Sequence, residues 1–313
     1  MLHNEIKTLD IQTLADSFGT TTEDIPEECI NLLNKMDREY MVLGHDEREK
    51  LIVDVLKKID SDKQIIGAPE RTKQWHLGWE ENLIQLRESD YDLKNVLPKF
   101  IKKNKPIRFM GNYIIPKEPH FEHLYYNVFR AWLFDKYFSS FDSVYDIGCG
   151  SSYNLVELCS RFPEKKIHGF DFVQSSVDIV NELAKKYDFN TKGQLFNIIE
   201  PNFDINLDEN SLVFTSGVIE QVASKFDKFI DFLLKKKPSL VINIEPTYEV
   251  YNQNQLFDYL AARFHQKRGY TKGYLPKLRE LESENKIKIL KTKRLNFGSL
   301  FMEGFTYIIW KPI

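Results

Sequence analysis

The sequence predicts an α/β fold: a mostly parallel sheet covered by helices on both faces, an antiparallel C-terminal hairpin, and an N-terminal helical region. Three observations predict it. After residue 111, short apolar runs alternate with amphipathic segments, which is the pattern of a parallel sheet between helices. The last two β-rich runs have no helix between them, as in a hairpin. Before residue 110, apolar residues recur at helical spacing instead.

The N-terminal part is expected to consist of helices joined by loops. Apolar residues at helical spacing predict helices within 30–43 and 50–59. Polar residues ahead of these two segments are candidate helix N-caps: Thr21, Thr22, Asp24 and Asp46. The expected organisation is therefore a helical accessory region or lid over residues 1–110 and a main domain over residues 111–313.

The main domain is expected to contain seven strands. Five of them should lie in the parallel part of the sheet, with helices between most of them: 143–148, 166–172, 194–199, 211–217 and 239–246. The runs 286–297 and 303–312 are separated only by the residues GSLFM, so they are expected to pair as an antiparallel hairpin at the sheet edge.

Composition narrows the class of protein. The 313 residues are 42% hydrophobic, which is enough to bury a sizeable core. Charged residues stand where a secretory signal would need an apolar run, and no stretch approaches the roughly 18 apolar residues of a membrane span, so a cytoplasmic protein is expected. Three cysteines show no CxxC pairing and predict free thiols, without a disulfide or metal site: Cys29, Cys149 and Cys159.

Charge is distributed unevenly along the chain. The net charge of -3 argues against general affinity for nucleic acid. Residues 1–60 carry 14 acidic against 7 basic side chains, and residues 263–294 carry 11 basic against 3 acidic ones. Two interpretations stay open: the segments are solvated or face each other, or the basic segment surrounds an acceptor that bears phosphate or carboxylate.

The segment DIGCGSS, residues 146–152, joins a predicted strand to a predicted helix, and the next strand ends at Asp171. In the dinucleotide-binding GxGxxG pattern the third glycine lets the helix pack on the strand. Tyr153 stands at that position, which argues against NAD or FAD. The phosphate-binding GxxxxGK[ST] loop is absent from the sequence as well.

These residues resemble the S-adenosylmethionine-dependent methyltransferases with a Rossmann-like seven-stranded sheet. The family's acidic-x-Gly-x-Gly-x-Gly motif is matched by Asp146, Gly148 and Gly150, with Ser152 in place of the third glycine. The resemblance implies S-adenosylmethionine as cofactor and S-adenosylhomocysteine as product. It implies that the glycines let the backbone approach the methionine part, that Asp146 orients the turn and the charged amino-acid end, and that Asp171 accepts both ribose hydroxyls.

Further segments fit the same resemblance. Asn197 would contact the edge of the adenine and Ile198 its face. Residues 215–222 resemble the segment after the fourth strand, which commonly ends Leu-Glu-His-Val, with Gln221 at the histidine position. The remaining cofactor contacts implied are Phe172, Ser216 and Gly217. The competing interpretation is a plain strand-to-helix turn in which Asp171 caps the next helix.

Methyl transfer to a hydroxyl group requires removal of a proton. Glu245 and His265 are candidates because they are expected near the carboxyl edge of the sheet, and Glu122 with His123 forms a second pair. The alternatives are a structural carboxylate paired with a basic neighbour for Glu245 and a surface helix position for His265.

The acceptor is expected to be a small molecule. Trp75, His76 and Trp79 offer rigid faces for a sugar or base, although core packing is the alternative. Arg268 and Tyr270 lie in a basic segment that suits an anionic acceptor. The resemblance is to methyltransferases of small metabolites, so O-methylation in surface polysaccharide or natural-product biosynthesis is expected. An RNA or protein methyltransferase and a noncatalytic binding module remain alternatives, and the oligomeric state is open.

Overall fold

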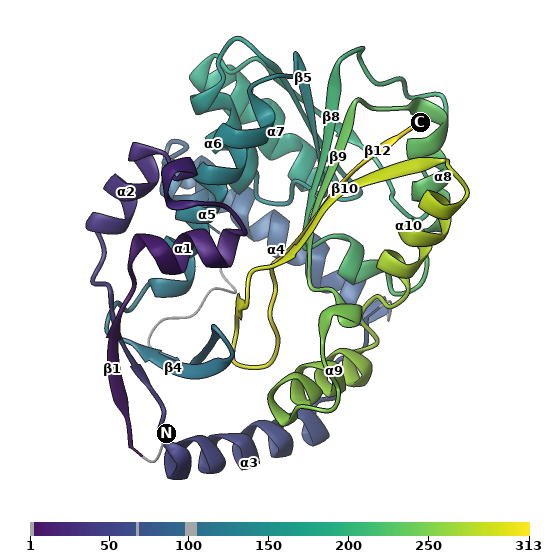
Figure 1. The fold of residues 1–313 in the computed structure, drawn as a ribbon. Helices are drawn as coiled ribbons and strands as arrows, with labels where there is room; N and C mark the ends of the chain where they lie inside the picture. Colours follow the sequence, from purple (N-terminus) through teal and green to yellow (C-terminus); the bar gives the residue numbers. More distant parts are fainter. Residues whose placement is uncertain (1–2, 67–68, 98–104) are drawn as a thin grey trace.

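A computed structural model describes residues 3–66, 69–97 and 105–313. Its centre is a seven-stranded sheet, the large sheet, with strand order β10-β12-β9-β8-β5-β6-β7 (Figure 1). β5 to β9 run parallel, and β12 and β10 complete one edge in antiparallel pairing. The strands are β5 Ser143–Ile147, β6 Lys166–Asp171, β7 Thr191–Leu195, β8 Ser211–Ser216, β9 Leu240–Glu245, β10 Ile287–Arg294 and β12 Thr306–Pro312.

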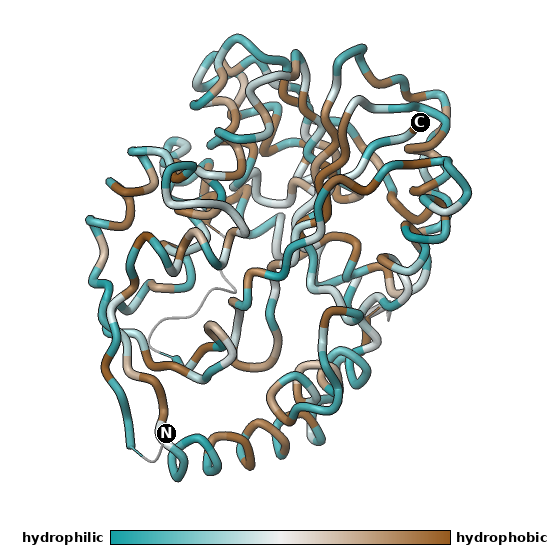
Figure 2. The backbone as a smooth tube through the Cα atoms, viewed as in Figure 1, coloured by the Kyte–Doolittle hydropathy of each residue, from teal (hydrophilic) through white to brown (hydrophobic). Residues whose placement is uncertain are grey.

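Helices cover both faces of the large sheet. Phe214 on β8 belongs to an apolar core shared with α5 and α6, whereas its neighbour Val213 belongs to a core shared with α8 and α10. Every residue of β5 is buried, as expected for a parallel strand between two helical layers, and hydrophobic residues follow the central strands in Figure 2. The helices are α5 Phe121–Phe138, α6 Tyr153–Arg161, α7 Gln174–Tyr187, α8 Asp227–Lys236, α9 Leu256–Arg268 and α10 Tyr274–Ser283.

A second, five-stranded antiparallel sheet, the small sheet, was not predicted. Its order is β1-β2-β4-β3-β11. Its strands are β1 Glu5–Thr8, β2 Glu39–Val42, β3 Ile107–Phe109, β4 Asn112–Pro116 and β11 Phe297–Gly298. β10 and β12 pair in antiparallel orientation, so the predicted C-terminal hairpin is confirmed. β11 belongs to the chain segment that connects these two strands, and it pairs with β3 of the small sheet.

The N-terminal helices are α1 Ile11–Phe18, α2 Glu27–Asn34, α3 His45–Ser61 and α4 Pro69–Glu88. Phe18 packs against Phe129 and Trp132 of α5, with ring centroids 5.3 and 5.2 Å apart. Part of the N-terminal region therefore shares one core with the segment leading into β5. The β3–β4 hairpin spans the expected boundary at residues 110–111, and the division into two domains stays a prediction.

Two element predictions are wrong in part. Within 30–43 the chain leaves α2 at Asn34 and forms β2 at 39–42, where it pairs with β1 and β4. β7 also lies earlier than predicted, at residues 191–195, since Gly193 lets the strand lie close to Val177 of α7, and residues 196–199 lie beyond the strand.

The predicted helix caps are also wrong for the two main helices. Thr21 precedes a short 3-10 turn at Thr22–Asp24, whereas α2 follows Pro26. α3 follows Gly44, which places Asp46 in its first turn, where its charge suits the helix dipole. The cap that the sequence reading missed is Asp10, whose carboxylate accepts a 2.7 Å hydrogen bond from the Thr13 amide.

Candidate functional site

The candidate site lies at the carboxyl ends of β5, β6 and β8. Counted along the chain, the strands of the large sheet have the spatial order 3-2-1-4-5-7-6. The chain goes from β5 to one side through β6 and β7, and then returns to the other side at β8. In open α/β sheets, the crevice at such a reversal is where ligands bind.

The turn after β5 is built on positive φ angles. Gly148 has φ 76°, and a Cβ there would lie 2.3 Å from the Val218 side chain. Gly150 has φ 52°, and a Cβ there would lie 2.8 Å from the Trp79 indole. Ser152, at the third motif position, also lies in the left-handed region at φ 68°, which explains why glycine suits that position. The absence of side chains at Gly148 and Gly150 therefore lets Val218 and Trp79 pack directly on the backbone of this turn.

Asp171, at the end of β6, is tied to this turn. Its carboxylate accepts hydrogen bonds from the Gly150 amide (2.9 Å) and the Val173 amide (3.0 Å). Burial nevertheless raises its pKa to about 6, although the backbone donors favour the charged form. Asp171 is not the N-cap residue of α7, because this helix begins at Gln174 and its N-cap is Val173. The carboxylate accepts only from the amide of that N-cap residue, so the helix-cap alternative holds only in part. Phe172 follows with 42% of its surface exposed.

Asp146 lies one residue before the end of β5 and is buried. Its Oδ2 atom has no hydrogen-bond partner among the described residues. Burial and the neighbouring charge of Asp171 raise its pKa to about 7, against an opposing effect of Arg130. A buried carboxylate oxygen without a donor, beside a glycine turn, fits a cationic group such as an ammonium.

The other predicted cofactor residues are placed as follows. Asn197 is exposed, and its Oδ1 accepts from the Ile199 amide at 2.9 Å, so its side chain closes a local turn. Ile198 is buried in the core on the α8 side. Ser216 lies 3.3 Å from the Tyr126 hydroxyl, and Gly217 adopts φ 67°. Ser216 and Gly217 therefore lie at the strand ends that form the crevice.

The Glu245 carboxylate accepts three hydrogen bonds from the end of β8 and the loop that follows it. Its carboxylate accepts from the Thr215 hydroxyl (2.9 Å) and the amides of Val218 and Glu220 (both 3.2 Å). Burial raises its pKa to about 7. These contacts give Glu245 a structural role, but through a hydroxyl and backbone amides and not through the basic neighbour expected in the alternative. Its catalytic role stays a prediction.

Glu220 was not singled out from sequence. Its Oε1 accepts from Gln221 at 2.8 Å, but its Oε2 is buried without a hydrogen-bond partner among the described residues. Burial and the charge of Glu245 raise its pKa to about 8. The sequence did offer a signal for this residue, because Glu220 stands at the Glu position of the Leu-Glu-His-Val resemblance. The sequence analysis considered only the next position, Gln221.

His265 does not lie on the surface, contrary to the alternative considered for it. Its side chain is fully buried beside Tyr251 and Tyr270, with ring centroids 5.6 and 5.3 Å away. Neither ring nitrogen has a hydrogen-bond partner in the described part of the chain, and burial lowers its pKa to about 3. The ring is therefore neutral at physiological pH.

Glu122 and His123 begin α5 but face different surroundings. Glu122 lines a small cavity with Pro116 of β4, and burial raises its pKa to about 7. The two ring nitrogens of His123 lie 3.1 Å from the Tyr153 hydroxyl and 3.1 Å from the Asn127 amide. His123 is therefore connected to the first residue of α6, directly after the glycine turn.

Arg268 is already paired. Its Nε donates to Asp62 at 2.8 Å and its Nη1 donates to the Tyr270 hydroxyl at 3.1 Å. Arg263 likewise pairs with Asp60 at 2.6 Å. These two ion pairs join α9 to the end of α3, so here the acidic and basic segments face each other.

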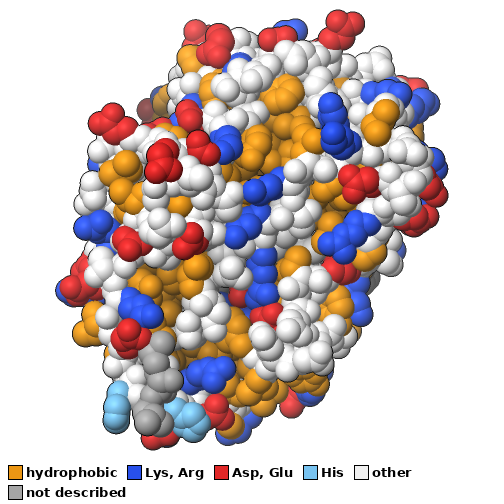
Figure 3. Space-filling view, in the orientation of Figure 1, with side chains coloured by type: hydrophobic (Ala, Val, Ile, Leu, Met, Phe, Trp, Pro, Cys, Tyr) orange, Lys and Arg blue, Asp and Glu red, His pale blue; other side chains and the backbone are white. Residues whose placement is uncertain are grey.

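Other basic residues of the 263–294 segment lie elsewhere. Figure 3 shows Lys and Arg side chains in the middle of the viewed face, where β10 meets α1. Lys291 of β10 donates to the Gly19 carbonyl at 2.9 Å. The segment therefore does not form one continuous rim around the crevice.

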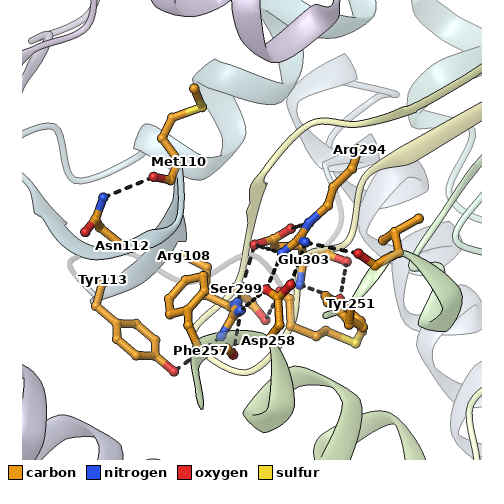
Figure 4. Close-up of polar contacts among 12 residues, drawn as sticks. Arg108, Met110, Asn112, Tyr113, Tyr251, Phe257, Asp258, Arg294, Ser299 and Glu303 are labelled. Atoms are coloured by element: carbon orange, nitrogen blue, oxygen red, sulfur yellow. Dashed lines mark hydrogen bonds and ion pairs between the residues drawn. The ribbon is translucent and has the colours of Figure 1, made fainter. Parts of the chain in front are cut away.

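A buried ion cluster, also missed from sequence, joins the small sheet to α9 and the β11–β12 connection (Figure 4). Arg294 donates to Asp258 at 2.6 and 2.8 Å and to Glu303 at 2.5 and 3.0 Å. Arg108, fully buried, lies 3.7 Å from both acids, and its guanidinium carbon is 3.4 Å from the Phe257 ring centroid. Two positive and two negative charges balance, which indicates a structural role.

Helix α4 brings Trp75, His76 and Trp79 to the crevice. Trp75 and Trp79 stack with centroids 5.4 Å apart, and Trp79 lies on Gly150. His76 meets the Phe172 ring edge to face at 5.6 Å. Arg71 lies over Trp75 at 4.6 Å and donates to the Gln221 amide oxygen at 3.4 Å.

Within the described residues, no cluster of His, Cys, Asp and Glu could hold a metal ion, and no helix is long and apolar enough to cross a membrane. The predicted free thiols are confirmed: all three cysteines are buried and unpaired. Burial raises the pKa of Cys29 and of Cys159 to about 12, which leaves them unreactive at neutral pH.

No protein-family model and no curated protein sequence matches the chain. Solved structures do match. The [4+2]-cyclase SpnF is 10% identical, with TM-score 0.50, covering 76% of this chain and 96% of its own. A SAM-dependent methyltransferase from Aquifex aeolicus is 13% identical (TM-score 0.41; 59% and 89% covered). The O-methyltransferase NcsB1 from neocarzinostatin biosynthesis is 13% identical (TM-score 0.38; 55% and 49% covered). The predicted Rossmann-like, seven-stranded fold with its antiparallel C-terminal hairpin is confirmed by the strand order of the large sheet.

Proposed function

We propose that this protein binds S-adenosylmethionine and transfers its methyl group to a small acceptor. The observation that carries the proposal is the link from Asp171 to Gly150, which joins the acidic end of β6 to the glycine turn after β5. This link lies where the strand order reverses. The unpartnered Oδ2 of Asp146 lies at the end of the same strand, β5, and supplies the acceptor that an ammonium group needs.

The residues at the turn fit the cofactor by their chemistry. Gly148 and Gly150 permit close backbone approach, Asp146 suits the amino-acid end, and Asp171 suits the ribose hydroxyls because each carboxylate oxygen keeps a second lone pair. The cofactor supplies an electrophilic methyl group. The protein aligns the acceptor with it, excludes water and removes a proton.

For the acceptor, we infer a small anionic molecule methylated on oxygen. Arg71 supports this inference because, among the described side chains, no carboxylate pairs with its guanidinium, which donates to Gln221 beside Glu220. The proton would pass to a buried carboxylate at the ends of β8 and β9. Glu220 and Glu245 both fit, because a pKa near 7 or 8 suits a general base at neutral pH. Surface polysaccharide and natural-product precursors are the acceptor classes to test first.

The first test measures cofactor binding by calorimetry. Asp171→Ala should weaken S-adenosylhomocysteine binding by about 1.5–3 kcal/mol, the range for a hydrogen bond to a charged group. Asp178→Ala is the matched control, since Asp178 is an aspartate on the next helix that bonds only to Gln174 in the described structure. Equal affinity of Asp171→Ala and the wild type would contradict the cofactor assignment.

The second test measures the reaction itself. The fold also supports other chemistry, since one structural match, with TM-score 0.50, is named a cyclase. Isotope-labelled methyl transfer from S-adenosylmethionine should therefore be followed with sugar phosphates, nucleotide sugars and hydroxy acids, with total RNA and protein extract as the competing acceptors. Label found only in RNA or protein would favour the macromolecular alternative. Cofactor binding without transfer to any of them would favour a noncatalytic module.

A further inference from the structure

Helix α4 is fixed to the body of the large-sheet domain. Its buried Leu83 and Leu86 belong to an apolar cluster with Val156 of α6 and with Ile179 and Leu183 of α7. This packing holds the C-terminal half of α4 over the helices that follow β5 and β6.

Polar contacts beside α4 reinforce this attachment. Arg87 donates to Glu182 at 2.5 and 3.0 Å, and the Tyr91 hydroxyl donates to the same carboxylate at 2.8 Å. The Ser151 hydroxyl, within the glycine turn, donates to the Val96 carbonyl at 2.6 Å. These contacts indicate that α4 is a built part of the site rather than a loosely held flap.

The other half of α4 crosses the strand ends that form the crevice. Trp79 lies on Gly150 after β5, His76 lies against Phe172 after β6, and Arg71 reaches Gln221 after β8. One helix therefore touches all three loops to which the cofactor is assigned.

We propose that Trp79 and His76 form a wall of the cofactor site, in place of the acceptor contacts predicted for them from sequence. This inference rests on the proposed function. Trp79 would cover the methionine end at Gly150, and His76 would cover the ribose and adenine side at Phe172. Aromatic faces bury large apolar area with few rotatable bonds, so a fixed helix that carries them strengthens binding at low entropic cost.

The test titrates S-adenosylhomocysteine into the full-length protein and four variants. Trp79→Ala and His76→Ala should each weaken binding, by about tenfold or more for Trp79, because removing a buried aromatic contact typically has that effect. Trp79→Phe should retain most of the affinity, which guards against a folding defect. Leu77→Ala is the matched control: Leu77 is 54% exposed on the same helix and should leave affinity unchanged.

A second readout is tryptophan fluorescence. The chain has four tryptophans, and Trp132 and Trp310 are buried away from the crevice in the apolar cores. Ligand binding should change the emission of the wild type, and most of this change should be lost in Trp79→Ala.

The outcomes separate the two claims. If Asp171→Ala loses affinity while Trp79→Ala and His76→Ala bind as tightly as the wild type or more tightly, the wall is refuted and the proposed function stands. A wild-type protein that binds neither S-adenosylmethionine nor S-adenosylhomocysteine refutes both.

Discussion

Replacing Asp146 with asparagine should stabilise the protein at alkaline pH and weaken its cofactor binding. The carboxyl is buried, and its pKa is raised from 3.8 to about 7. A shift of about three pH units corresponds to about 4 kcal/mol of penalty for the ionised form. The amide avoids this penalty but leaves its own buried polar atoms short of partners, which costs about 1–3 kcal/mol. The expected net gain is about 1–3 kcal/mol above pH 7.

The direction in which stability changes with pH follows from proton binding to Asp146. Between pH 4 and pH 7 the folded state holds a proton on Asp146 that the unfolded state has lost, so stability falls as pH rises through this window. Asp146→Asn removes that dependence. Urea unfolding at pH 4.5, 6 and 8.5 should show a stability difference that shifts toward the variant as pH rises and levels off above pH 7. A difference that is constant with pH, or that favours the wild type at pH 8.5, would refute the reasoning.

Ligand binding should show the opposite trend. The ionised carboxylate would pair with the cofactor's ammonium group, so wild-type affinity for S-adenosylhomocysteine should rise by up to ~tenfold per pH unit below pH 7. Asp146→Asn should bind more weakly and lose this slope. Calorimetry at the same pH values measures both effects, and a variant with wild-type affinity would remove Asp146 from the cofactor site.

Three further predictions concern neighbouring positions. Ser152→Gly should stabilise the protein by about 1 kcal/mol in thermal unfolding, because glycine adopts a positive φ without strain and the buried Ser152 hydroxyl has no described hydrogen-bond partner. A loss of stability would show that this hydroxyl makes a hydrogen bond. His265→Leu should raise the free energy of unfolding by about 1 kcal/mol and leave cofactor affinity unchanged, because the buried ring has no described hydrogen bond. A large loss of stability would mean that the imidazole has a hydrogen-bond partner. Arg268→Lys should lower the free energy of unfolding by about 0.5–1 kcal/mol, because it weakens the ion pair with Asp62, and should leave cofactor affinity unchanged. A defect in turnover without a loss of stability would instead support the predicted contact of Arg268 with the acceptor.

Sequence reasoning succeeded where local pattern and tertiary structure agree. β5 and β6 are short runs of mostly buried residues in which Asp146 stands next to last and Asp171 last, so the sequence indicates both the strands and the sheet edge at which these carboxylates lie. The glycine turn was predictable because its φ angles leave few residue choices. The parallel sheet and the glycine turn after β5 were accordingly predicted close to their observed places.

The remainder depends on pairing between distant segments. Four-residue and shorter strands such as β2 and β11 carry too few residues to show a period, and only their partners define them. Arg108 and Arg294 read as ordinary basic residues, although they share buried acids from α9 and the β11–β12 connection. Trp79 was recognised as an aromatic contact, but its position on Gly150 depends on how α4 lies over the sheet.

The small sheet has a consequence for synthesis of the protein. β11 completes the sheet against β3, but it lies some 190 positions later in the chain. A chain emerging from the ribosome therefore presents β3 with an open hydrogen-bonding edge until β11 has been translated. Such edges pair readily with other chains, and contacts of high sequence separation form slowly. Nascent chains that stall shortly before residue 297 should therefore be the most prone to aggregate, because β3 still lacks its partner strand.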